Sequence, residues 1–226
     1  MHFQHQTASL AALGIKVSIL GCYVNLSSPD PMIRQQAVSS FQQHIALASS
    51  FQAAIVGTET GTVGNGYTVK NYTEAAYQTA RQSVIEMVAF AETLGVTVGI
   101  EAGINHPLYT ADLAKRLVQE IQSPNLRIIM DCANLISIEN YHKQEEVINH
   151  ALDQLRDDIC SMHLKDFVVE NGKIKIVPVG TGWMNYEQIL KFLKYDKPLM
   201  FASLEATTEK HLPTALDHIK ERYEQV

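Results

Sequence analysis

Long apolar runs are missing from this sequence. None of them approaches the roughly 18 residues that a membrane-spanning helix needs. The first residues have neither the basic start nor the small-residue cleavage pattern of a secretory signal peptide. Cysteine is scarce as well, and the three cysteines, Cys22, Cys132 and Cys160, form no CxxC pair. These absences predict a cytoplasmic protein with reduced thiols.

The sequence also lacks an excess of basic residues. The 18 lysines and arginines are outnumbered by 24 acidic residues, which gives a net charge of -6 at pH 7. Without a basic stripe there is no electrostatic case for binding nucleic acid. Linker-like segments are absent too, and 46% of the residues are hydrophobic, which is enough for one core. We therefore expect a single domain over residues 1–226 that acts on a small molecule.

What the sequence does contain is an alternation of short apolar segments with longer amphipathic ones. The short segments, rich in β-branched residues, predict strands at Ile15–Tyr23, Ala53–Gly57, Val96–Glu101, Leu126–Asp131, Ile159–Leu164 and Leu199–Glu205. The longer segments have helical spacing, and they are Pro31–Phe51, Tyr72–Leu94, Thr110–Ile121, Tyr141–Leu155, Tyr186–Leu193 and Pro213–Tyr223. Apolar strands separated by helices are typical of a parallel sheet covered on both faces. Six such units favour an α/β fold of the TIM-type (β/α) barrel class.

Two segments depart from this alternation. Phe167–Val177 alternates around Asn171-Gly172, which predicts a β-hairpin in place of a helix. Met1–Leu13 has the pattern of a helix tail that ends at Gly14, so the chain opens inside a β/α unit. Six strands do not close an eight-stranded barrel, so we expect an incomplete barrel. Because an open sheet edge promotes aggregation, we also expect a homo-oligomer or a further segment to cover it.

Four predicted strands end in a side chain that can bind a metal: Glu101, Asp131, His163 and Glu205. Catalytic residues of parallel barrels gather at this carboxyl-terminal rim, and the four are spaced by about one β/α unit each. Three carboxylates and an imidazole suit Mn²⁺, Mg²⁺ or Co²⁺, with Zn²⁺ possible. Each residue taken alone could equally be a solvated loop charge or a helix cap. Their succession at consecutive strand ends predicts a site for one divalent ion.

Five segments in a fixed order resemble those of a known family. They are Gly99–Ala102, Ile129–Asn134, Met162–Asp166, Pro178–Gly182 and Ser203–Ala206. The most specific part is His163-Leu-Lys165-Asp166 followed by Gly180-Thr-Gly182. In these segments the chain resembles the xylose isomerase-like sugar phosphate isomerases and epimerases, which include ketose 3-epimerases and hydroxypyruvate isomerases.

The resemblance implies both a strand numbering and a chemistry. It places the four ligands on barrel strands five to eight and Ile15–Tyr23 on strand three, so that the first two β/α units are missing. It implies an α-hydroxycarbonyl sugar that chelates the metal, which acts as a Lewis acid on the developing enediolate. Glu101 and Glu205 would then remove and return a proton as an acid/base pair. We expect proton transfer because hydride shifts usually rely on two metals.

Six further residues are candidates for substrate binding, and each has a plainer alternative. Asp166 is expected to orient the His163 ring, or else to form a surface ion pair. Trp183 could cover the sugar or simply pack, and Asn134 could be a turn residue. Lys165 matches the family motif, whereas Glu59 and His106 could each face the pocket or solvent. The candidates are Glu59, His106, Asn134, Lys165, Asp166 and Trp183.

Other functions remain open at this point. A metal-dependent dehydratase of the same superfamily would use the same ligands. An endonuclease acting at abasic sites would need more histidines at strand ends than His163 alone, and a less negative chain. A catalytically impaired barrel remnant with a binding role would keep the ligands without turnover.

Overall fold

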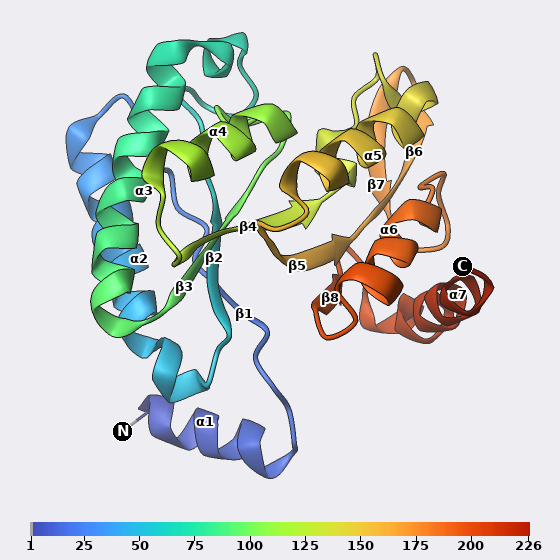
Figure 1. The fold of residues 1–226 in the computed structure, drawn as a ribbon, viewed down its shortest axis with the longest axis horizontal. Coiled ribbons are helices and arrows are strands. Elements are labelled where there is room, and N and C mark those ends of the chain that lie inside the picture. Colours follow the sequence, from blue (N-terminus) through green and yellow to red (C-terminus); the bar gives the residue numbers. More distant parts are fainter. Residues whose placement is uncertain (1) are drawn as a thin grey trace. The chain divides into compact units, whose positions relative to one another are not determined.

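Six parallel strands alternate with helices along the chain. In the computed structural model, which describes residues 2–226, these strands follow the order β1-β2-β3-β4-β5-β8 in one sheet (Figure 1). Their bounds are β1 Ile19–Gly21, β2 Ile55–Glu59, β3 Thr97–Glu101, β4 Leu126–Asp131, β5 Ile159–Leu164 and β8 Phe201–Leu204. The helices are α1 His2–Ala12, α2 Pro31–Phe51, α3 Glu74–Leu94, α4 Ala111–Ile121, α5 Gln144–Leu155, α6 Glu187–Lys191 and α7 Leu212–Gln225. This order confirms the prediction of six parallel strands of a TIM-type barrel.

The chain divides into two compact units. The first contains Met1–Glu101, Asn105–Tyr109 and Arg116–Arg127. The second contains Ala102–Ile104, Thr110–Lys115 and Ile128–Val226. Both units belong to the β/α succession, so the expectation of a single domain over residues 1–226 stays a prediction.

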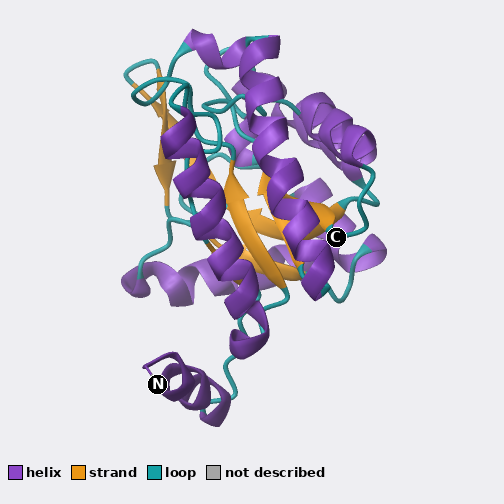
Figure 2. Ribbon diagram, turned by 90° about the vertical axis from the view of Figure 1, so that its left-hand side faces the viewer, coloured by secondary structure: helices purple, strands orange, loops and turns teal. Residues whose placement is uncertain are grey.

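The first unit packs two long helices against three strands. Strand β2 pairs in parallel with β1 and with β3, and Glu59 lies beside Glu101 in the register of the second pair. Figure 2 shows α2 and α3 in front of these strands. Large apolar side chains of the two helices, such as Phe41 and Met87, are fully buried. Their burial supplies the core that fixes the strand ends of this unit.

Local signals in the sequence set the ends of both helices. The side chain of Asp30 accepts a hydrogen bond from the N–H of Met32, and Pro31 occupies the first turn of α2. Thr73 caps α3 in the same way through the N–H of Ala76. Gly95 ends α3 with a φ of +66°, a conformation that glycine adopts without steric cost.

The second unit places β5 between β4 and β8. Asp131 of β4 pairs in register with His163 of β5, and His163 pairs with Ser203 of β8. Both pairings are parallel, so the carboxyl ends of the three strands meet at one edge. Helix α5 covers this unit with the buried side chains of Ile148, Leu152 and Leu155.

The predicted hairpin is confirmed. Strands β6 (Asp166–Glu170) and β7 (Lys173–Val177) pair antiparallel and form a separate two-stranded sheet. Asn171 and Gly172 connect them with φ values of +52° and +70°. Two successive left-handed residues are what a two-residue type I′ turn requires.

Several predicted elements have different ends in the structure. The strand expected over Ile15–Tyr23 is a strand only over Ile19–Gly21, and it pairs with a single neighbour, β2, in the described sheet. The helix expected over Tyr186–Leu193 is α-helical only at Glu187–Lys191 and continues as a π-helical turn over Phe192–Asp196. Among the described helices, none has both the length and the apolar character that crossing a bilayer demands.

Candidate metal centre

Three metal-capable side chains lie together at the strand ends of the second unit. Asp131 is the last residue of β4, and His163 stands opposite it near the end of β5. Glu205 follows the last residue of β8, and its N–H donates a hydrogen bond to the carbonyl of Leu164 at 2.9 Å. This bond holds Glu205 level with the end of β5, as if the strand continued by one residue.

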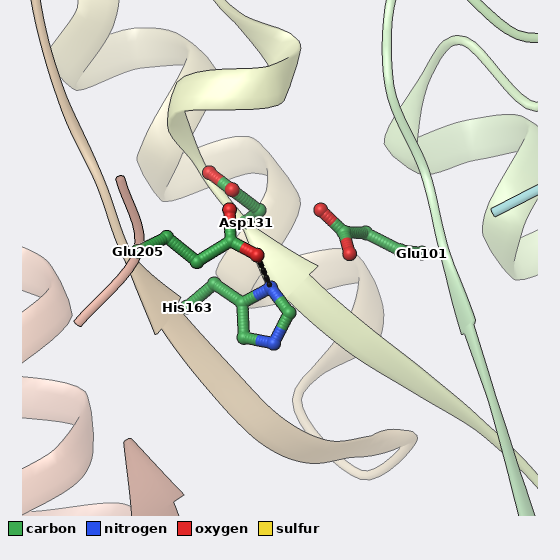
Figure 3. A group of neighbouring side chains, drawn as sticks. All are labelled: Glu101, Asp131, His163 and Glu205. Atoms are coloured by element: carbon green, nitrogen blue, oxygen red, sulfur yellow. Dashed lines mark ion pairs between the residues drawn. The ribbon is translucent and has the colours of Figure 1, made fainter. Parts of the chain in front are cut away.

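The side chains of these three residues face one another (Figure 3). The Nδ1 atom of His163 lies 3.2 Å from Oε1 of Glu205. One nitrogen or oxygen from each residue falls within 4.8 Å of those of the others. Asp131 and His163 are buried, whereas 28% of the Glu205 side chain is exposed. One imidazole and two carboxylates in a largely buried cluster could hold a divalent ion.

Lys165 contributes its ammonium to this cluster. Its Nζ atom lies 2.6 Å from Oδ2 of Asp131 and 2.5 Å from Oε2 of Glu205. It also donates a hydrogen bond to Oδ1 of Asn134 at 3.0 Å. The backbone N–H of Asn134 in turn donates to Oδ1 of Asp131 at 3.2 Å. The structure therefore brings Asn134 and Lys165 into direct contact with two of the candidate ligands.

The mutual contacts shift the pKa values of both partners. Burial alone would raise the pKa of Glu205, but His163 and Lys165 beside it hold this pKa below its usual range. Burial alone would lower the pKa of Lys165, yet Asp131 and Glu205 raise it above its usual range. Both shifts favour the charged forms, so the ammonium of Lys165 lies beside an ionised Glu205 carboxylate at neutral pH.

Asp166 has a different set of partners from those that the sequence suggested. Its two carboxylate oxygens accept hydrogen bonds from four backbone N–H groups at 2.8 to 3.0 Å, those of Phe167, Gly180, Gly182 and Met184. The Nδ1 atom of His163 instead lies beside Glu205. These four bonds fasten the loop after the hairpin to the end of β5, and the expected part of Asp166 in orienting His163 stays a prediction.

The two glycines of the Gly-x-Gly segment make this arrangement possible. A Cβ atom on Gly182 would lie 2.3 Å from Oδ1 of Asp166 and 2.4 Å from the carbonyl oxygen of Phe167. Gly180 has a φ of +84°, and a Cβ there would lie 2.8 Å from the His218 ring. Only glycine fits at both positions, which explains why the motif joins an aspartate to a distant Gly-x-Gly.

Trp183 lies in the loop that Asp166 fastens. Its backbone N–H donates a hydrogen bond to the carbonyl of Phe167 at 2.8 Å, and its backbone carbonyl accepts one from the side chain of Gln144. Trp183 is 52% exposed, and its ring centroid lies 6.2 Å from that of Tyr141. The backbone of Trp183 is thus held by hydrogen bonds while about half of the residue stays exposed to solvent.

Sequence reasoning does not identify the contact that Tyr186 makes near the cluster. Tyr186 is buried, and its hydroxyl donates a hydrogen bond to the backbone carbonyl of Lys165 at 3.0 Å. A tyrosine before a short helix carries no pattern that distinguishes this contact from ordinary packing. Tyr186 holds the main chain of Lys165 in place, and the backbone bonds of Asp166 hold the residue that follows.

The remaining candidates lie in the first unit. Glu101, which is also labelled in Figure 3, is the buried last residue of β3. Nε2 of His106 lies 3.3 Å from Oε1 of Glu59, and Nδ1 donates to the carbonyl of Gly61 at 2.8 Å. Burial would lower the pKa of His106, but Glu59, Gly61 and Glu101 together raise it. Glu59 and His106 therefore form a pair at the strand ends of this unit.

Several solved structures have a similar fold. A xylose isomerase domain protein from Planctomyces limnophilus is 20% identical, with a TM-score of 0.78 over 100% of this chain and 83% of that chain. A D-tagatose 3-epimerase-like protein is 18% identical, with a TM-score of 0.77 over 99% and 83% of the two chains. The IOLI protein, solved with a zinc atom, is 16% identical, with a TM-score of 0.78 over 100% and 82%. At these identities the similarity shows the fold alone.

The sequence itself gives a family assignment. No curated protein sequence matches the chain. A family model described as xylose isomerase-like TIM barrel, however, matches residues 6–222, which include both compact units almost entirely. On this match and on the six parallel strands, the chain belongs to the xylose isomerase-like TIM barrel family.

Proposed function

We propose that this chain is a divalent-metal-dependent isomerase or epimerase of a small sugar that works by proton transfer. The observation that carries the proposal is the cluster of Asp131, His163 and Glu205 at adjoining strand ends. The family and the D-tagatose 3-epimerase-like protein among the similar structures support the substrate class.

Glu101 is the fourth ligand in this proposal. It ends β3, the strand that precedes β4 in the sheet order, and it is buried like Asp131 and His163. A divalent ion held by these four residues would supply Lewis-acid stabilisation of negative charge that develops on the sugar oxygens. A ligand set of three carboxylates and one imidazole is compatible with Mn²⁺, Mg²⁺, Co²⁺ or Zn²⁺.

Glu205 is our candidate for the base that removes the α-proton. Its side chain is 28% exposed, so a substrate can approach it, whereas Asp131 is enclosed. Its lowered pKa keeps it ionised at neutral pH, and an ionised Oε atom can accept the proton from carbon. Glu101 is the proposed partner that returns a proton, which would make the reaction an epimerisation or an isomerisation.

The other candidate residues have distinct parts in the proposal. Lys165 and Asn134 are placed to donate hydrogen bonds to sugar oxygens beside Asp131 and Glu205. Trp183 offers an exposed ring for stacking, and Glu59 and His106 offer a polar pair. Asp166 acts through the loop that it fastens. We also propose a neutral sugar as substrate, a cytoplasmic location and a homo-oligomer that covers an outer edge of the sheet.

Deuterium uptake from D₂O into a panel of ketoses tests the proposal. The purified chain, loaded in turn with Mn²⁺, Mg²⁺, Co²⁺ and Zn²⁺, should exchange the α-proton of at least one sugar. Glu205→Gln should keep most of the metal and slow the exchange by roughly 10² to 10⁴-fold, the usual contribution of a general base. Glu187→Gln, which alters an exposed ion pair with Lys191, is the matched control. Exchange at the wild-type rate in Glu205→Gln, or into no sugar by any metal form, would contradict the proposal.

A further inference from the structure

The ammonium of Lys165 makes three contacts, and each uses an oxygen acceptor. Two of these acceptors belong to candidate metal ligands, Asp131 and Glu205, and the third is Oδ1 of Asn134. An ammonium group has three N–H donors, and these three oxygens lie within 3.0 Å of it. The Lys165 side chain is 12% exposed, which leaves little water to compete for these bonds.

The carboxylate oxygens of the cluster are divided among a small set of partners. Oε1 of Glu205 faces His163, and Oε2 faces Lys165. Oδ1 of Asp131 accepts the N–H of Asn134, and Oδ2 faces Lys165. A divalent ion bound by Asp131 and Glu205 would therefore draw on oxygens that Lys165 already engages.

The position of Lys165 is fixed from its backbone outward. The residue before it, Leu164, accepts the N–H of Glu205, and its own carbonyl accepts the hydroxyl of Tyr186. The residue after it, Asp166, is bonded to four backbone N–H groups. Because the main chain is held on both sides, the ammonium can leave the carboxylates only by rotating its own side chain.

We infer that Lys165 competes with the metal ion for the oxygens of Asp131 and Glu205 and so weakens the metal affinity of the site. This inference rests on the proposed function, because it takes the same cluster as the metal centre. A positive charge fixed within a few ångströms of a divalent ion repels it, and the repulsion is strong where water is scarce. The consequence is an exchangeable metal site in place of a permanently loaded one.

Mn²⁺ binding to the full chain, measured by isothermal titration calorimetry after treatment with a chelator, tests the inference. Lys165→Met should bind Mn²⁺ at least about tenfold more tightly than the wild type, since it removes both the competitor and its charge. Lys165→Gln keeps two N–H donors for the carboxylates and should shift the affinity in the same direction. It also provides the measurement if Lys165→Met does not fold.

Lys115→Met is the matched control. Lys115 forms a half-buried ion pair with Asp158 at 2.7 Å in the same unit, away from the cluster. Lys115→Met should lose some thermal stability, and so should Lys165→Met when a chelator is present. The Mn²⁺ affinity of Lys115→Met, however, should equal that of the wild type. Mn²⁺ affinity of Lys165→Met and Lys165→Gln at or below that of the wild type would overturn the inference and leave the proposed function standing. A wild-type chain that binds no divalent ion would remove both.

Discussion

Two carboxylates of the second unit, Asp131 and Asp166, are equally buried but have opposite kinds of partner. Asp131 faces the ammonium of Lys165 and lies within reach of His163 and Glu205. The carboxylate oxygens of Asp166, three residues after His163, accept hydrogen bonds from four backbone N–H groups. The first arrangement gathers charged side chains that can exchange partners, and the second fastens a loop.

The residues of one short motif therefore have two different roles. In His163-Leu-Lys165-Asp166, the side chains of His163 and Lys165 lie in the candidate metal centre. The side chain of Asp166 binds the backbone of the neighbouring loop instead. The Asp166 carboxylate cannot lose its main-chain donors unless the loop unfolds. The Asp131 carboxylate faces the side chain of Lys165, which can move away and leave the oxygen to a metal ion. We therefore expect substitutions in the first group to change metal binding, and those in the second to change stability.

Loss of the imidazole should give the largest effect on metal binding. In His163→Ala, Mn²⁺ affinity should fall by more than roughly 100-fold, beyond the range that outer-shell partners of metals usually contribute. Calorimetric titration measures it, with His150→Ala as the control, since His150 forms an exposed pair with Asp112. Unchanged affinity in His163→Ala would exclude this residue from the ligand set.

Neutralising Asp166 should give the largest loss of stability. Asp166→Asn replaces an oxygen that accepts backbone N–H groups with an amide nitrogen that cannot accept them, and it removes the charge from the remaining bonds. The free energy of unfolding, from urea denaturation, should fall by about 3 kcal/mol. A change within experimental error would show that the loop does not depend on this carboxylate.

The glycines of the loop should give a smaller loss. Gly182→Ala places a methyl group against Asp166 and the Phe167 carbonyl, and overpacking of this kind costs about 1 to 3 kcal/mol. Gly172→Ala in the hairpin turn meets open space, so only its left-handed conformation opposes the change, at about 1 kcal/mol. Equal costs for the two variants, measured by the same denaturation, would argue against the close contact at Gly182.

Removing the pair of Glu59 and His106 in the first unit should change the free energy of unfolding least, and the change should depend on pH. The folded-state pKa of His106 is raised, so the pair with Glu59 stabilises the fold fully below the unfolded value near pH 6.5 and loses its contribution as the pH rises through the folded value. The contribution of this partly exposed pair should stay below about 1 kcal/mol. Glu59→Gln should flatten the stability profile at pH values above about 6.5, and a profile identical to that of the wild type would contradict this prediction.

The sequence predicts the fold well because its signals are local. Alternating apolar segments locate the six strands, and Asn171-Gly172 locates the hairpin turn. It also singles out the residues at the strand ends, since Asp131 and His163 close apolar runs. What it does not show are contacts between distant backbone atoms. Gly180 and Gly182 bind Asp166 through their backbone N–H groups, which no residue type reveals. The bond from the Tyr186 hydroxyl to the carbonyl of Lys165 follows from no regular spacing of residues.

The metal content of variants at Asp131 and Asp166 separates the two roles. Equilibrium dialysis against Mn²⁺, followed by elemental analysis, should find roughly one ion per wild-type chain, as a single cluster of hard ligands implies. Asp131→Asn should lose most of this metal, while Asp166→Asn, kept under conditions in which it stays folded, should retain it. Full metal content in Asp131→Asn, or an equal loss in both variants, would contradict the account of a metal centre built on Asp131, His163 and Glu205.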